Sequence, residues 1–309
     1  MKITVPPIKS QGIKTKLVNT IKNCITWDND GKWIEPFVGT GVVGFNVRPN
    51  KALFADTNPH LINFYNEIKT KKLNSKIVRE YLTEESEKLK EKGETFYYNI
   101  RERFNNTYNS LDFIFLNRAC FNGIIRFNRK GKFNVPFCKK SERFSKSYIT
   151  KIVNQVDNIQ KLIGYYDWDF VVQDYIMTLS NVSADDFIYC DPPYVNRHVD
   201  YFNSWNEKDE YKLFMLLSNC PAKFILSTWH SNKYRKNKYI EEYWSSFFII
   251  TKEHFYHVGG SEINRNSMLE AFVLNYRPSL KFSQPHNETE QLILLEPKIN
   301  YQNQIVSAI

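Results

Sequence analysis

The sequence predicts an α/β fold, in which a Rossmann-like sheet is interrupted by a mainly helical module that carries a β-hairpin. Apolar strand-like runs alternate with helical patterns near both ends of the chain, as in βαβ units. Between them lies a stretch rich in lysine and glutamate that has helical periodicity. Several of the candidate strands end in a glycine turn or an acid, which places polar groups at one edge of the predicted sheet.

The first part of the chain is predicted to form a strand, a turn and a helix in that order. Residues 33–36 form the end of a short apolar strand, and a glycine turn leads to the helix-like run 42–47. Residues 52–56 form a second strand ending in Asp56, and residues 59–73 have helical spacing. Residues 75–115 form the helical module, whose apolar positions include Leu82, Leu89, Phe96 and Ile100.

The remaining elements are a hairpin and a second set of strands. Residues 126–128 and 132–134 flank the turn 129–131, which predicts a hairpin within 121–138. Further strands are expected at residues 170–172, 187–190 and 224–227, followed by an antiparallel pair at 255–258 and 272–276. Residues 229–232 are expected to form a loop after a strand. The polar tail contains one apolar patch, at residues 292–295.

These patterns predict three parts of the protein. Residues 1–70 and 151–280 form one discontinuous cofactor-binding domain, residues 71–150 form the inserted module, and residues 281–309 are a tail of unassigned role. Five cysteines with no C-x-x-C pair favour free thiols in a reducing compartment. Without a secretory or membrane-spanning apolar stretch, the sequence favours a cytoplasmic protein with no membrane partner.

Positive charge is concentrated in one segment of the chain. The formal net charge is +9. Residues 126–146 hold eight basic residues and one acid, Glu142, interleaved with phenylalanines at positions 121, 127, 133, 137 and 144. Such a combination is typical of surfaces that meet phosphates and stacked bases together, although blocks of like charge are often only solvated loops.

The first chemical motif is the glycine turn Glu35-Pro36-Phe37-Val38-Gly39-Thr40-Gly41, which follows a strand. Glycines allow a sharp turn and close approach of a nucleotide, and an acid ending the next strand, here Asp56, can accept hydrogen bonds from ribose hydroxyls. NAD and S-adenosylmethionine fit this logic equally well. Because Pro36 and Phe37 separate the strand from the glycines, a pyrophosphate site is disfavoured.

The second motif is Asp191-Pro192-Pro193-Tyr194, at the end of the strand 187–190. An acid at the carboxyl end of a strand points into the crevice where α/β sheets bind ligands, and the two prolines stiffen the loop. The Asp191 carboxylate and the Pro192 carbonyl can each accept one N–H of an exocyclic amino group. Tyr194 offers a ring face on which an extruded base can stack.

Together these motifs resemble the Dam-type DNA adenine-N6 methyltransferases in their α arrangement, with the cofactor motif first, target recognition next and the catalytic tetrapeptide last. Asp56-Thr57-Asn58, Asn122-Gly123-Ile124-Ile125-Arg126-Phe127-Asn128 and Phe133-Asn134-Val135-Pro136-Phe137 share in the resemblance, which covers residues 6–278. It implies that S-adenosylmethionine methylates N6 of a flipped adenine in a short double-stranded site, leaving S-adenosylhomocysteine, without a metal. It also implies a prokaryotic or viral setting, in restriction-modification beside a restriction endonuclease or as an orphan enzyme.

The resemblance also assigns roles to individual residues. Asp191, Pro192, Pro193 and Tyr194 would be catalytic. The cofactor would be bound by Lys14, Glu35, Pro36, Phe37, Gly39, Gly41, Asp56, Asp174, Tyr175 and Asp191. Ser10 stands where the family has an aromatic residue, and Asp174 could equally be a helix cap.

For DNA, the resemblance implies that Phe121 is an aromatic wedge and that Arg126 faces a guanine edge, which suggests a GATC-like site. Lys139 and Lys140 would hold phosphates, which position the protein without specifying the sequence. The DNA-binding residues would be Lys9, Phe121, Asn122, Ile124, Arg126, Asn128, Arg129, Lys130, Lys132, Asn134, Pro136, Lys139 and Lys140.

Three other readings of the sequence stand beside this one. An NAD-dependent oxidoreductase would explain only the glycine turn and Asp56. Methylation of cytosine N4 or of a protein amide would use the same cofactor, but those families more often carry Ser or Asn at the position of Asp191. A DNA-binding module without catalysis would need neither motif. His198, His230, His254 and His257 lack the spacing of metal ligands.

Overall fold

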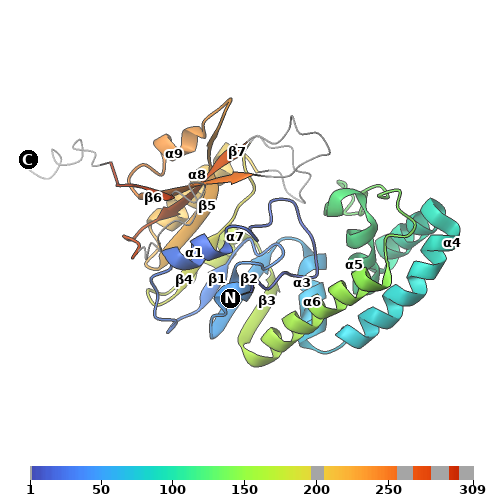
Figure 1. Ribbon diagram of the computed structural model, residues 1–309. Coiled ribbons are helices and arrows are strands. Elements are labelled where there is room, and N and C mark those ends of the chain that lie inside the picture. Colours follow the sequence, from blue (N-terminus) through green and yellow to red (C-terminus); the bar gives the residue numbers. More distant parts are fainter. Residues whose placement is uncertain (1, 196–204, 256–266, 280–291, 299–309) are drawn as a thin grey trace, which may run out of the picture. The chain divides into compact units, whose positions relative to one another are not determined.

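The computed structural model describes residues 2–195, 205–255, 267–279 and 292–298 (Figure 1). The chain divides into two compact units. Unit 1 comprises Met1–Asn19, Lys32–Thr178 and His198–Ser204, and unit 2 comprises Thr20–Gly31, Leu179–Arg197 and Trp205–Ile309. The division falls inside α1 (Val18–Cys24) and α7 (Tyr175–Leu179). The predicted functional domains, with bounds at residues 70, 150 and 280, are defined differently from these compact units and stay a prediction.

The strands of unit 1 are parallel and follow the order β3-β2-β1. They are β1 (Trp33–Glu35), β2 (Lys51–Asp56) and β3 (Asp167–Val172). All three residues of β1 are buried, as expected for a parallel strand covered on both faces. These strands confirm the sequence predictions at 33–36, 52–56 and 170–172. Their carboxyl ends bring Glu35, Asp56 and Val172 to one edge.

Aromatic packing holds the first helices of unit 1 on its strands. α2 (Gly44–Val47) contributes Phe45, whose ring stacks on Trp168 of β3 with centroids 5.5 Å apart. α3 (Pro59–Lys69) contributes Tyr65, whose ring stacks on Phe170 at 5.2 Å. Each such pair stabilises the core by about 0.5–1.5 kcal/mol beyond its buried area. The predicted helices at 42–47 and 59–73 are therefore present, each shorter than the pattern suggested.

The inserted stretch is mainly helical, as predicted, and a further helix extends beyond residue 150. It contains α4 (Ser75–Thr107), α5 (Ser110–Ala119) and α6 (Lys146–Tyr165), and both α5 and α6 pack on α4. α6 was not predicted from the sequence, although its buried positions recur at helical spacing, namely Ile149, Ile152, Val156, Ile159 and Ile163. Because α6 packs on α4, the helical layer continues past residue 150.

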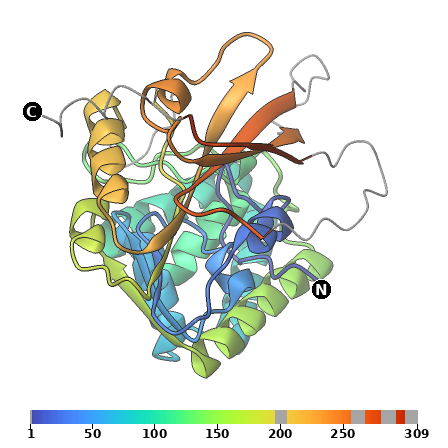
Figure 2. The same cartoon turned by 90° about the vertical axis from the view of Figure 1, so that its left-hand side faces the viewer.

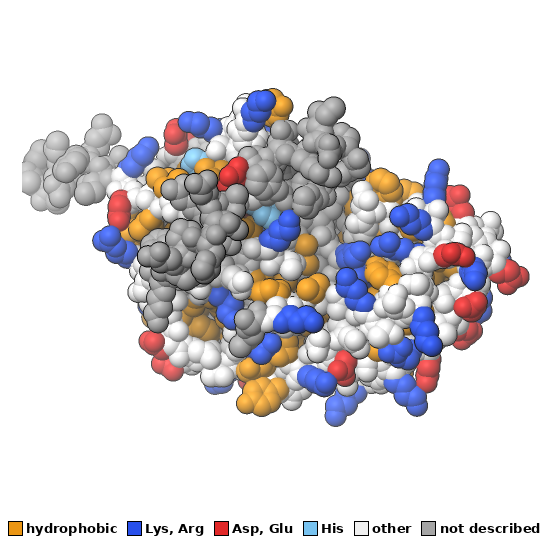
Figure 3. Space-filling view, in the orientation of Figure 1, with side chains coloured by type: hydrophobic (Ala, Val, Ile, Leu, Met, Phe, Trp, Pro, Cys, Tyr) orange, Lys and Arg blue, Asp and Glu red, His pale blue; other side chains and the backbone are white. Residues whose placement is uncertain are grey.

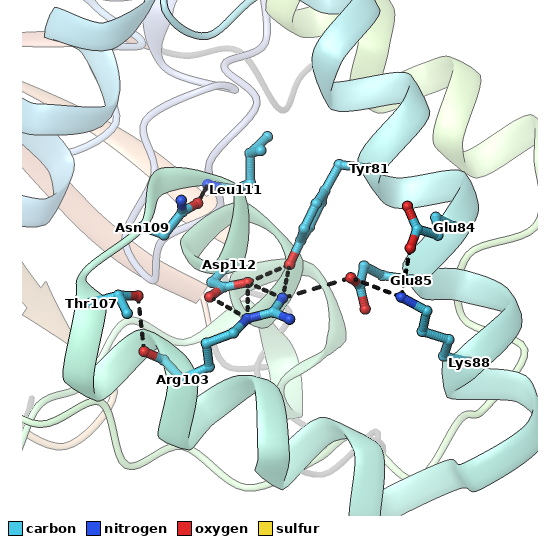
Figure 4. A network of polar contacts seen from close by, with 9 residues as sticks. All are labelled: Tyr81, Glu84, Glu85, Lys88, Arg103, Thr107, Asn109, Leu111 and Asp112. Atoms are coloured by element: carbon cyan, nitrogen blue, oxygen red, sulfur yellow. Dashed lines mark hydrogen bonds and ion pairs between the residues drawn. The ribbon is translucent and has the colours of Figure 1, made fainter.

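A partly buried ionic network joins the two halves of α4 to α5 (Figure 4). α4 is interrupted at Gly93, where φ is 58° and ψ is −132°. Arg103, after the break, places Nη2 2.6 Å from Oδ1 of Asp112, which is buried in α5. Tyr81 and Glu85, before the break, contact the same pair. The network thereby compensates the buried Asp112 charge and fixes the angle of the broken helix.

The predicted hairpin has the predicted turn but no regular strands. Phe127 and Phe133 form an isolated antiparallel bridge, and the N–H of Asn128 donates to the carbonyl of Lys132 at 2.9 Å. Gly131 takes φ 70°, the left-handed value that a glycine allows at a tight turn. The segment begins with the 3₁₀ turn η1 (Phe121–Gly123).

The strands of unit 2 follow the order β4-β5-β7-β6-β8, with β4 and β5 parallel and the others antiparallel (Figure 2). They are β4 (Phe187–Cys190), β5 (Lys223–Asn232), β6 (Phe248–Phe255), β7 (Ser267–Leu274) and β8 (Leu292–Leu295). The strands predicted at 187–190 and 224–227 are confirmed. The helices of this unit include α8 (Glu207–Ser218) and α9 (Lys238–Glu242).

Two predictions in unit 2 are wrong in position. β7 pairs antiparallel with both β5 and β6, and β6 lies at residues 248–255 rather than at 255–258. A continuous apolar run does not show where this strand begins, and residues 256–258 lie outside the described part. Residues 229–232 belong to β5 rather than to a loop, because a bulge between Trp229 and Ser231 lets the ladder continue. The apolar tail patch forms β8, which pairs with β6.

Candidate active site

The glycine turn follows β1 directly, and main-chain hydrogen bonds within the turn and to β2 hold its conformation. The N–H of Val38 donates to the carbonyl of Ala55 at 2.8 Å, and the N–H of Gly41 donates to the carbonyl of Val38 at 2.8 Å. Gly39 and Gly41 have φ of 50° and 73°. A Cβ on Gly41 would lie 2.5 Å from the ring of Phe45, so this position requires glycine for space as well as for conformation.

Asp56 at the end of β2 is bonded to this turn. Its Oδ2 accepts from the N–H of Gly39 at 2.9 Å, and its Oδ1 accepts from the N–H of Asn58 at 2.8 Å. Burial raises the pKa of Asp56 above its ordinary value, and the backbone N–H donors oppose that rise. The structure therefore brings together Gly39 and Asp56, two residues that the sequence analysis assigned to one site.

An aromatic pair lies beside the turn in unit 1. The rings of Phe37 and Tyr175 stack with centroids 5.5 Å apart and planes 26° apart. The N–H of Gln173, after β3, donates to the carbonyl of Asp56 at 3.1 Å, so the ends of β2 and β3 are also joined. Asp174 is exposed and caps α7, since its Oδ1 accepts from the N–H of Met177 at 2.8 Å. The cap that the sequence left as an alternative is present.

Three other residues assigned to the cofactor are buried. Glu35 accepts from the indole N–H of Trp33 at 2.7 Å, and it is 2% exposed. Pro36 is buried beside it. Lys14 is 3% exposed, and its Nζ donates to the carbonyl of Gly12 at 3.2 Å. Glu35 is thus engaged with the strand that precedes the turn.

In unit 2, the tetrapeptide Asp191-Pro192-Pro193-Tyr194 follows β4. Pro192 is buried, and Asp191, Pro193 and Tyr194 are half-buried. The hydroxyl of Tyr194 donates to Oε2 of Glu270 at 3.0 Å. Glu270 lies in the middle of β7, opposite Trp229 of β5, and is fully buried. Glu270 was not predicted from the sequence, where its signal was a single acid within the apolar strand Ser267–Leu274.

The basic segment, residues 126–146, and the neighbouring residues assigned to DNA include both exposed and half-buried side chains. Figure 3 shows Lys and Arg side chains, in blue, over the part of unit 1 that contains it. Ile124, Arg126 and Asn134 are half-buried. Lys9, on the N-terminal segment, is also half-buried. The other residues assigned to DNA are all exposed: Phe121, Asn122, Asn128, Arg129, Lys130, Lys132, Pro136, Lys139 and Lys140.

The phenylalanines of this segment differ in their surroundings. Phe121 is 52% exposed, whereas the other four are at most 6% exposed, namely Phe127, Phe133, Phe137 and Phe144. These four pack under the segment, for example Phe127 against His60 of α3 at 4.8 Å. The expectation that the interleaved aromatics meet stacked bases therefore fails for all of them except Phe121.

Arg126 is held by Asn134 across the hairpin. Its Nε donates to Oδ1 of Asn134 at 2.8 Å, and its Nη2 donates to the carbonyl of Asn134 at 3.1 Å. A guanidinium held at two points has a fixed direction, which favours a bidentate contact with a partner. The sequence assigned both residues to DNA but gave no sign that they pair.

Comparison with known families decides what these motifs belong to. Residues 10–258 match the family model described as "D12 class N6 adenine-specific DNA methyltransferase". The chain belongs to this family. It is an adenine-specific DNA methyltransferase of the D12 class, and DNA is its substrate. The mixed α/β architecture agrees with the methyltransferase sheet that the sequence predicted.

Individual relatives support the same assignment. The chain is similar to the type II methyltransferase M.MjaIII of Methanocaldococcus jannaschii, with 31% identity covering 72% of this chain and 83% of the relative. It is 35% identical to a DNA adenine methylase of Vibrio cholerae over 52% of this chain and 55% of the relative. It is 26% identical to the type II methyltransferase M.FokI of Planomicrobium okeanokoites over 87% of this chain. The chain spans 42% of that relative's length.

The described residues of this D12 methyltransferase offer neither a metal cluster nor a membrane-spanning helix. They contain no group of three or more His, Cys, Asp or Glu side chains that could hold a metal ion. No helix that the structure describes is both long and apolar enough to cross a membrane. His198 and His257 lie outside the described residues. His230 and His254 belong to β5 and β6.

Proposed function

We propose that S-adenosylmethionine is the methyl donor and that the glycine turn of unit 1 binds it. A Cβ built on Gly39 would meet no described atom within 4 Å, so the turn has open space on the side away from its packing. The Asp56 carboxylate suits the ribose hydroxyls, and the stacked rings of Phe37 and Tyr175 suit the adenine. The residues present therefore fit this cofactor.

The same geometry argues against a dinucleotide. A pyrophosphate needs free backbone N–H groups at the glycines and at a helix N-terminus. Here the N–H of Gly39 is donated to Asp56 and that of Gly41 to Val38, and α2 has only four residues. Lys14, Glu35, Pro36, Asp174 and Asp191 complete the proposed cofactor set.

We further propose that Asp191, Pro192, Pro193 and Tyr194 act on a flipped adenine. Asp191 and the Pro192 carbonyl accept the two N6 hydrogens, which turns the nitrogen lone pair out of ring conjugation. Tyr194 stacks on the base, and its bond to Glu270 fixes the orientation of its ring. When bound, S-adenosylmethionine supplies an electrophilic methyl group that an amine nitrogen attacks without a covalent enzyme intermediate.

Target recognition is assigned to residues 71–150, and the catalytic domain to residues 1–70 and 151–280. Arg126, directed by Asn134, reads a guanine edge, which fits a GATC-like site. Phe121 is the exposed wedge, and the exposed lysines hold phosphates. Because two relatives are named type II methyltransferases, we infer a cognate restriction endonuclease that cuts the same site.

The observation that carries these roles is an acid and a proline-fixed carbonyl placed directly after β4. The test is Asp191→Ala, with Asp169→Ala, an exposed aspartate of β3, as its control. We expect methyl transfer to fall about 10²–10³-fold, as when one preorganised polar group is removed from an active site, with DNA affinity changed less than about threefold. Full methylation by Asp191→Ala would refute the assignment, and base analysis of the product separates adenine N6 from cytosine N4.

A further inference from the structure

The N-terminal strap, residues 4–14, connects two functional parts of unit 1. It has no regular secondary structure, and it carries Lys9, assigned to DNA, and Lys14, assigned to the cofactor. Its centre is buried at Pro6, Pro7 and Ile8. Irregular backbone that is buried must satisfy its polar groups through side chains. The side chains that hydrogen-bond to this backbone show which elements hold the strap in place.

One end of the strap is fastened to the helix that follows the glycine turn. The N–H of Thr4 donates to Oδ1 of Asn46 at 2.8 Å, and Nδ2 of Asn46 donates to the carbonyl of Thr4 at 2.8 Å. Asn46 lies in α2, and its Nδ2 also donates to the carbonyl of Val42 at 2.7 Å. The strap is therefore hydrogen-bonded to the helix that follows the proposed cofactor turn.

The middle of the strap is hydrogen-bonded to α5. The N–H of Lys9 donates to Oδ1 of Asn117 at 2.8 Å, and Nδ2 of Asn117 donates to the carbonyl of Lys9 at 2.9 Å. The next residue, Arg118, donates to the carbonyl of Pro7 through Nε, at 2.7 Å, and through Nη2. Asn117 and Arg118 are 0% and 2% exposed. Nothing in the assigned chemistry requires two such polar groups in the interior.

Asn117 also reaches the DNA-facing segment. Its Nδ2 lies 3.4 Å from the carbonyl of Gly123, in the turn that presents Phe121. Gly123 packs on the strap, since a Cβ there would lie 2.9 Å from Cδ of Lys9. One buried amide thus contacts both the strap and the turn, and neither can shift without breaking its hydrogen bonds.

Arg118 extends the connection to the other side of the basic segment. Its Nη2 donates to Oε1 of Gln155 in α6 at 2.6 Å, and its own carbonyl accepts from Nε of Arg143 at 3.0 Å. Arg143 lies in the basic segment, so a phosphate that draws Arg143 outward would pull directly on the residue that holds Pro7.

We propose that Asn117 and Arg118 are positioning residues that couple DNA binding at the turn 121–123 to cofactor binding at the turn 37–41 through the N-terminal strap. This inference rests on the proposed function, because that proposal places DNA and cofactor at these turns. A position of the strap that one ligand favours and that also suits the other makes the second ligand bind more tightly, and the coupling is reciprocal.

The test measures the affinity for S-adenosylhomocysteine, an unreactive probe, by calorimetry with and without a duplex that carries the methylated site. The coupling factor is the dissociation constant without DNA divided by the dissociation constant with DNA. In the native protein we expect a factor of about 5 or more. In Asn117→Ala we expect a factor near 1, while the affinity for the probe without DNA changes less than about threefold.

The matched control is Asn105→Ala. Asn105 of α4 makes an equivalent two-bond clamp, accepting from the N–H of Phe133 at 2.7 Å and donating to its carbonyl at 3.1 Å, but it does not contact the strap through these bonds. It should weaken DNA binding and keep the coupling factor. If Asn117→Ala does not fold, Gln155→Leu, which releases one bond of Arg118, takes its place and should lower the factor at least twofold.

The outcomes separate the two proposals. A factor of 1 in the native protein, or an unchanged factor in a folded Asn117→Ala or Gln155→Leu variant, overturns the coupling. Loss of the factor in Asn105→Ala as well as in Asn117→Ala would also overturn it, since any damage to the segment would then suffice. If the native protein binds no S-adenosylhomocysteine at all, the proposed function fails first.

Discussion

The glycine turn and the basic segment are both short irregular stretches assigned to ligand binding, yet they are built in opposite ways. In the turn, the backbone N–H groups and the Asp56 carboxylate are bonded to one another, and Gly41 packs against Phe45. In the basic segment, four of the five phenylalanines are buried, and most of the charged side chains extend into solvent.

This difference matches what each region has to bind. A small cofactor gains affinity from polar groups that are fixed before it arrives, since no ordering cost remains. A DNA backbone presents a broad, regular field of charge, which flexible lysines can follow at a small cost per contact. Arg126 is intermediate, because Asn134 holds it in one direction at a half-buried position.

The largest expected effect on ligand binding lies in the rigid turn. Asp56→Ala removes the acceptor of the Gly39 and Asn58 N–H groups and of the ribose hydroxyls, so we expect S-adenosylmethionine affinity to fall about 100-fold. Thr57→Ala, an exposed neighbour, is the control. Equilibrium binding of the cofactor measures both. An Asp56→Ala variant that binds the cofactor normally would remove the turn from the site.

Two glycine substitutions compare the regions directly. Gly41 and Gly131 have φ of 73° and 70°, but a Cβ would lie 2.5 Å from Phe45 at Gly41 and would meet nothing within 4 Å at Gly131. Gly41→Ala should reduce the free energy of unfolding by about 3 kcal/mol, and Gly131→Ala by about 1 kcal/mol. Chemical denaturation measures both. Equal losses would mean that the turn is no more tightly packed than the hairpin.

The stability of the packing beneath the basic segment should depend on pH. Burial lowers the pKa of His60 to about 4 from its ordinary 6.5, and its ring stacks on Phe127. The folded protein keeps His60 neutral, so its contribution to stability is complete above pH 6.5 and is lost as pH falls towards 4. Between pH 7 and pH 5 this amounts to about 1–2 kcal/mol.

His60→Phe isolates that contribution. Denaturation of the native protein and of this variant at pH 7 and pH 5 should show a smaller loss for the variant, because phenylalanine does not titrate. If both lose the same free energy of unfolding, protonation of His60 is not the cause.

The smallest effect is expected on the exposed face of the segment. Lys140→Ala should weaken binding to all DNA sequences alike and reduce the slope of log affinity against log salt by about 1. Lys72→Ala, an exposed lysine after α3, should leave the slope unchanged. A sequence-dependent effect of Lys140→Ala would show that it contacts a base edge.

Local sequence patterns were sufficient for much of the fold and for the motifs. β4 was predicted with the residues it has, because Phe187–Cys190 is an apolar run that ends at an acid. Asp56 and the glycine turn were assigned to one site because both follow strands, and the structure joins them by a hydrogen bond. β6 was misplaced because an apolar run such as 248–250 does not by itself show where a strand begins.

Contacts between distant residues could not be predicted in this way. Tyr194 and Glu270 are 76 residues apart, and Lys9 and Asn117 are 108 apart, so no local spacing signals either pair. The charge pattern alone did not tell Phe121 from the four other phenylalanines, and only the family resemblance singled it out as the wedge.

The sequence alone thus determined which residue types follow each strand, because strand ends and turns depend on neighbours within a few positions. Only the tertiary structure decided which side chains are buried, which acid supports Tyr194 and what the N-terminal strap is fastened to. These depend on packing and hydrogen bonding between segments that meet only after the chain has folded.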